Sequence, residues 1–139
     1  MDTVDTVLLT TDLRMLVYTS VLTVILPMAY AVARARTPGG LKWGVGNRAG
    51  EKVAFPAWSL RAELAHANLL ENLLPFAILV LVAHLSGQAS EVTALAARIF
   101  FWARVGHAAV YIAGITHVRT AVFFVGLAAE LVILFQILA

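Results

Sequence analysis

The sequence contains no cysteine and few charged residues. Of its 139 residues, 13% are Asp, Glu, Lys or Arg and 61% are hydrophobic. Soluble domains carry about 25% charged and about 45–50% apolar residues. This deficit of charge excludes a soluble globule and a disordered chain. The absence of cysteine excludes a disulfide scaffold, thiol nucleophiles, zinc fingers and iron–sulfur clusters. We therefore expect a single integral membrane domain over residues 1–139.

Four largely apolar runs have the length that a bilayer requires, which is about 20 residues. They predict an all-α membrane protein, a bundle of four transmembrane helices, because a helix satisfies its own backbone hydrogen bonds inside lipid. The expected spans are about 13–34, 59–84, 91–113 and 118–138. Pro27 lies inside the first span and is expected to kink that helix without ending it.

The basic residues are concentrated between the first two spans. Six of the ten lie between Arg34 and Arg61, whereas the turn at 85–90 has none. The positive-inside rule therefore places loop 35–57 in the cytoplasm and both termini outside. The short loops favour a bacterial inner membrane. The pI near 9.4 follows from this topology, and we expect no nucleic-acid partner.

Polar residues inside the expected spans gather on a few helical faces. At 100° per residue, one face of the second span holds Arg61, Asn68, Glu71 and Asn72. One stripe of the third span holds Arg104, His107 and Tyr111, and Arg119 and Glu130 are in phase on the fourth. Because such groups are costly in lipid, they indicate a pocket between helices near the cytoplasmic face. The pocket suits a small anionic molecule together with an apolar one.

Each of these residues also has a purely structural interpretation. Arg61 and Arg119 lie near helix ends, from which their side chains could reach the membrane surface. Glu71 could form an ion pair with an arginine between helices or subunits. Asn68 could hydrogen-bond to a neighbouring helix. No spacing of ligand residues indicates a metal site, and no repeat or filter motif indicates a transporter or channel.

Two motifs resemble those of the MAPEG family, the membrane-associated proteins of eicosanoid and glutathione metabolism. The second span reads R-A-x-x-A-H-x-N-x-x-E-x-x-x-P-F from Arg61 to Phe76. The third span reads R-x-x-H-x-x-x-Y from Arg104 to Tyr111, and Arg119-Thr120 follows eight residues later. The resemblance covers about residues 13–138, and the sequence looks like that of a bacterial-type member of the family.

The resemblance implies a homotrimer that binds glutathione between subunits and takes a hydrophobic small molecule from the membrane lipids. It implies a glutathione-dependent transferase or peroxidase with Arg119 as the catalytic stabiliser of the thiolate. The implied glutathione-binding residues are Asn68, Glu71, His107, Tyr111, Arg61, and Arg34 or Arg36 from the first span. A thiol of pKa about 8.5 is mostly protonated at neutral pH, so a guanidinium held against it favours the reactive thiolate.

The sequence departs from the family pattern at two positions of the second-span motif. Leu64 and Ala67 stand where members that act on eicosanoids have arginines that hold the glutathione carboxylates. Each lost charge-assisted contact is worth about 1.5–3 kcal/mol. The alternatives are therefore glutathione bound in a shifted or weaker way through Arg34, Arg36 or Arg61, and another thiol or a lipid in the pocket. A further alternative is a non-catalytic trimer that binds lipid or acts as a scaffold. Polar residues that only join helices are a third interpretation.

Overall fold

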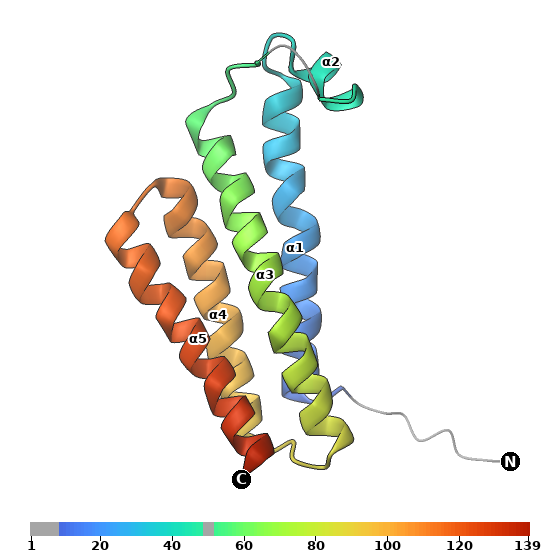
Figure 1. Ribbon diagram of the computed structural model, residues 1–139, viewed down its shortest axis with the longest axis vertical. Helices are drawn as coiled ribbons and strands as arrows, with labels where there is room; N and C mark the ends of the chain where they lie inside the picture. Colours follow the sequence, from blue (N-terminus) through green and yellow to red (C-terminus); the bar gives the residue numbers. More distant parts are fainter. Residues whose placement is uncertain (1–8, 49–51) are drawn as a thin grey trace, which may run out of the picture.

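The computed structural model describes residues 9–48 and 52–139. This part of the chain forms four long helices that run alternately up and down, with the short helix α2 at one end (Figure 1). The helices are α1 (Thr11–Ala35), α2 (Gly40–Val45), α3 (Ala57–Leu85), α4 (Glu91–Ala113) and α5 (Thr116–Leu138). Each long helix begins and ends within two residues of an expected span. Pro27 lies inside α1 without ending it.

Three of the long helices, α1, α3 and α5, are long and apolar enough to cross a membrane. The fourth, α4, does not meet that criterion, because Arg98, Arg104 and His107 lower its mean hydropathy. It has a similar length and packs against α1, α3 and α5. Arg104 and His107 of α4 are buried in the bundle, whereas Arg98 is exposed.

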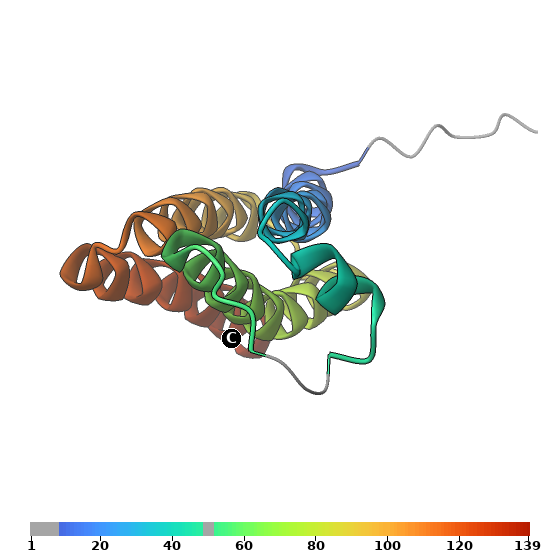
Figure 2. The ribbon, with the colours of Figure 1, turned by 90° about the horizontal axis from the view of Figure 1, so that it is seen from above.

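The helices α3 and α4 form the centre of the bundle. They pack against each other and against both outer helices, whereas α1 and α5 share no contact among the described residues. Viewed from above, α1 and α5 lie on opposite sides of this central pair (Figure 2). Consequently, the space enclosed by α3, α4 and α5 lies apart from the space enclosed by α1, α2 and α3, and each contains a cavity that is described below.

Small side chains allow the helices to approach closely in the core. The rings of Phe76 on α3 and Phe100 on α4 stack with centroids 3.9 Å apart. Around them the core is filled by Ala83, Ala97 and Ala129, all buried. Such packing of small residues is the usual basis of helix association in a membrane, where the hydrophobic effect does not drive it.

Short turns fix the order of α3, α4 and α5. The helix α4 begins at a capping box formed by Ser90 and Thr93. It ends at Gly114, whose φ of +83° lies in the left-handed region that glycine adopts without strain. Only Ile115 separates Gly114 from the first residue of α5. The last turn of α4 and the first turn of α5 are thereby held side by side.

A buried carboxylate fastens the opposite end of the bundle. Asp12 on α1 is 2% exposed and pairs with the Nε2 atom of His84 on α3 at 2.9 Å. It also accepts hydrogen bonds from the hydroxyls of Thr10 and Thr93, the latter on α4. Asp12 therefore joins three helices at the end where α1 begins.

Candidate functional site

A cavity of about 300 Å³ lies between α3, α4 and α5, close to the turn at Gly114. Its lining comes from the middle of α3, the last turns of α4 and the first turns of α5. The residues are Asn68, His107, Tyr111, Arg119, Thr120, Phe123 and Phe124. The structure therefore brings together four of the residues singled out from the sequence, which are Asn68, His107, Tyr111 and Arg119.

One wall of this cavity is a cation stacked on aromatic rings. The guanidinium carbon of Arg119 lies 4.6 Å from the centroid of the Tyr111 ring. The His107 ring meets Tyr111 edge-on at 5.5 Å and Phe123 at 6.2 Å. Arg119 and Tyr111 are half-buried and His107 is buried. Stacking on Tyr111 fixes the position of the guanidinium charge of Arg119.

The part of the lining that comes from α3 offers a hydrogen-bond acceptor without a donor. The Oδ1 atom of Asn68 is buried and has no hydrogen-bond partner among the described residues. The side-chain nitrogen of Asn72 donates to the backbone oxygen of Asn68 at 2.7 Å, so it does not satisfy the amide. Buried polar atoms are nearly always hydrogen-bonded, and an exception in a cavity points to a ligand or an ordered water.

Behind the cavity, Arg104 on α4 is 1% exposed. Its guanidinium lies between the rings of Phe100 and Phe123, at 5.0 and 5.3 Å, and its Nη2 atom donates to the backbone oxygen of Phe123 at 3.3 Å. Gly126 leaves the space for it, since a Cβ there would lie 2.8 Å from Nε. Glu130, a turn further along α5, is also buried, and its Oε1 atom has no hydrogen-bond partner among the described residues. The buried arginine therefore supports the Phe123 wall.

Three residues expected in the site lie outside this cavity. Glu71 is exposed on the surface of α3 and does not line the cavity. The Nε atom of Arg61 donates to the backbone oxygen of Ile112 at 2.8 Å, close to the end of α4. The guanidinium of Arg34 holds both carboxylate oxygens of Glu63, at 2.8 and 3.1 Å. Arg61 and Arg34 thus have structural partners within the chain.

Two residues that hold arginines in place, Glu63 for Arg34 and Gly126 for Arg104, were not predicted from the sequence. Glu63 was not named, although it follows Arg61 by two residues and is a carboxylate beside a basic segment. Only the packing of α1 against α3 shows that it meets Arg34. Gly126 was also missed, and its only signal is a glycine one turn before Glu130 in an apolar helix. No group of three or more His, Asp or Glu side chains that could hold a metal occurs within residues 9–48 and 52–139.

These features define a helical integral membrane protein with a polar pocket between its helices. The model of the MAPEG family matches residues 15–139, and the chain belongs to this family. No curated protein and no solved structure matches the chain. The family membership predicted from the two motifs is therefore confirmed over nearly the whole sequence.

Proposed function

We propose that the chain is a glutathione-dependent transferase or peroxidase that acts on hydrophobic electrophiles within the membrane. The observation that carries this proposal is the placement of Arg119 against Tyr111 in a cavity that also holds the unpaired Oδ1 atom of Asn68. The Arg119 guanidinium would stabilise an anionic sulfur. The Asn68 Oδ1 atom would accept a hydrogen bond from a donor such as the amine or a peptide N–H of glutathione. Membership of the MAPEG family supports the same substrate.

In this proposal Arg119 acts as an electrostatic stabiliser and no separate base is needed. A fixed guanidinium in a poorly solvated pocket lowers the pKa of a nearby thiol, and each unit corresponds to about 1.36 kcal/mol. His107 and Tyr111 hold the reacting sulfur close to Arg119. In a conjugation, the thiol proton passes to water, and the resulting thiolate forms a bond to the electrophilic carbon while the leaving group departs with the former bonding pair.

We further propose that the site is completed by neighbouring subunits of a homotrimer. Glu71 is an exposed carboxylate in the middle of α3, a helix apolar enough to span the membrane. Because a charged group facing lipid is costly, a second copy is expected to cover it. In the assembled trimer Glu71 and a first-span arginine (Arg34 or Arg36) would then approach the ligand from different subunits.

A non-catalytic lipid-binding or scaffolding trimer is the second candidate. It is favoured by Leu64, which is 54% exposed on α3 where eicosanoid-metabolising members are expected to have an arginine, and by exposed Ala67 beside it. These side chains offer no charge to the carboxylates of glutathione. In the third interpretation the polar residues only join helices, as the bond from Asn72 to the Asn68 backbone does.

The test uses the purified protein in detergent and glutathione conjugation to an aryl halide. We expect activity that Arg119→Ala abolishes and Arg98→Ala retains, since Arg98 is an exposed arginine of α4 outside the cavity. Glutathione at a hundred times its dissociation constant should raise the stability by about 2.7 kcal/mol. If the protein shows no activity and glutathione gives no thermal shift, the second candidate is favoured. Activity that Arg119→Ala does not affect would refute the role of Arg119.

For the topology, we propose a single membrane domain with loop 35–57 in the cytoplasm of a bacterial cell and both termini outside. The absence of native cysteine makes this simple to test. A cysteine introduced at exposed Lys42 should be protected from a membrane-impermeant maleimide in intact cells. A cysteine at exposed Ser86, in the opposite turn, should react. The reverse pattern would invert the proposed orientation.

A further inference from the structure

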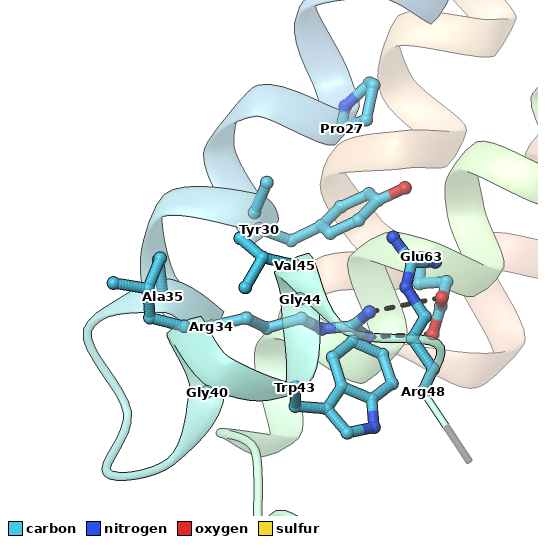
Figure 3. Close-up of a pocket in the computed structure, with 12 residues that line it drawn as sticks. Pro27, Tyr30, Arg34, Ala35, Gly40, Trp43, Gly44, Val45, Arg48 and Glu63 are labelled. Carbon is cyan, nitrogen blue, oxygen red and sulfur yellow. Dashed lines mark hydrogen bonds and ion pairs between the residues drawn. The ribbon is translucent and has the colours of Figure 1, made fainter.

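A second cavity, of about 330 Å³, lies at the end of α1, away from the Arg119 pocket. It is formed by the last turns of α1, by α2 and the residues after it, and by Glu63 of α3. In Figure 3 the Arg34 side chain extends toward Glu63, with Trp43 and Arg48 beside this pair. The two cavities share no lining residue. Arg34, which lines this cavity, is one of the two first-span arginines placed near the ligand of the proposed trimer, so the inference below rests on Arg48 and Trp43, which have no part in the proposed transferase activity.

The charge of this cavity favours an anion. Arg34 is 7% exposed, and its Nη atoms are engaged by Glu63 and by the backbone oxygen of Ser59. Its Nε atom is buried without a hydrogen-bond partner in the described part of the chain. Since Glu63 balances the charge of Arg34, Arg48 supplies a net positive charge to the lining. The Arg48 guanidinium lies over the Trp43 ring at 5.1 Å, where its edge remains accessible.

The remaining lining and the surroundings are apolar. Leu41 and Val45 on α2 line the cavity and are 62% and 80% exposed. On α1, Met28 is 62% exposed and follows Pro27, which lines the cavity. A soluble anion would leave these surfaces uncovered. An amphiphile would cover them with its chains while its charged group met Arg48.

We propose that this cavity binds the phosphate headgroup of an anionic phospholipid, with Arg48 as its principal cation and Trp43 as its aromatic wall. The acyl chains then lie along the exposed apolar face of α1. Arginine and phosphate form strong charge-assisted hydrogen bonds, and basic pockets at a membrane surface are typical sites for anionic lipid headgroups.

Trp43 itself can report the occupant. The reporter protein carries Trp58→Phe and Trp102→Phe, both at exposed positions, so that Trp43 is its only tryptophan. It is reconstituted into phosphatidylcholine vesicles that contain either brominated phosphatidylglycerol or brominated phosphatidylcholine, because bromine quenches tryptophan on contact. We expect stronger quenching of Trp43 by the anionic lipid than by the zwitterionic one. Far-ultraviolet circular dichroism confirms that each variant is folded.

The matched control separates a site from general attraction to a charged surface. Arg48→Gln and Arg36→Gln remove the same charge from the same segment, but Arg36 does not line the cavity. We expect Arg48→Gln to abolish the preference for phosphatidylglycerol and Arg36→Gln to retain it. Equal losses in both variants, equal quenching by both lipids, or no quenching because a second copy covers Trp43 would each overturn the proposal. Inorganic phosphate that removes the preference would assign the site to a soluble anion and overturn the lipid.

Discussion

Replacing Gly126 with alanine tests how tightly Arg104 is held between α4 and α5. An added Cβ would lie 2.8 Å from both the Cζ and the Nε atoms of Arg104, closer than real Cβ contacts. The guanidinium cannot move aside easily, because Phe100 and Phe123 enclose it and the side chain is 1% exposed. Moving it would also break the bond to the Phe123 backbone oxygen.

Gly106 on α4 provides the matched control. A Cβ there would meet only the Cγ1 atom of Val122 at 3.7 Å, an ordinary van der Waals contact. Both substitutions gain about 0.5–1 kcal/mol from replacing a glycine inside a helix. Only Gly126→Ala also incurs the cost of overpacking, which is about 1–3 kcal/mol. We therefore expect Gly126→Ala to be less stable than Gly106→Ala by about 1–3 kcal/mol.

The assay is unfolding by dodecyl sulfate in mixed micelles, followed by circular dichroism, for both alanine variants. A second comparison places Gly126→Ala in an Arg104→Met background, where the guanidinium is gone. The cost of the added methyl group should then shrink, giving a coupling of about 0.5–3 kcal/mol between the two positions. Equal stability of the two alanine variants, or no coupling to Arg104, would refute the reasoning.

Two further predictions concern the ends of the bundle. Asp12→Ala removes the acceptor that joins three helices and should destabilise the protein by about 1.5–3 kcal/mol, whereas Arg14→Ala, at an exposed position of α1, should have little effect on the unfolding midpoint. Arg61→Ala removes the charge-assisted bond to the Ile112 backbone oxygen and should cost about 1.5–3 kcal/mol in the same assay. If Arg98→Ala, at an exposed site, is equally costly, the bond to Ile112 is not the cause.

The helices could be predicted from the sequence because each long apolar run has one stable form in a bilayer. Uninterrupted segments such as Met15–Ala33 leave the backbone no alternative to internal hydrogen bonds. The structure of the loop was harder to predict, since the glycine-rich segment after Pro38 gave no sign of the helix α2. A six-residue helix depends on contacts such as the edge-on packing of Trp43 against Phe55, which periodicity does not reveal.

For the candidate site, the sequence predicted only which residues of a single helix lie on the same face. The spacing of His107 and Tyr111 places them on one face of α4, and the structure has them in ring contact. The same logic grouped Glu71 with Asn68, which share a helical face although only Asn68 lines the cavity. Helical phase states which residues point the same way, but the neighbouring helix decides which of them are covered.

The scarcity of charge and the four long apolar runs, by themselves, determined a helical membrane protein, the lack of cysteine excluded other classes, and two motifs determined its family. These properties are encoded locally, in hydropathy and in residue spacing. Only the tertiary structure decided the partner of each ionisable side chain: Glu63 for Arg34, the Ile112 backbone for Arg61, and the Tyr111 ring for Arg119. The reason is physical, because the free energy of a buried charge depends on groups brought to it by other helices, and the residue spacing within one helix does not specify them.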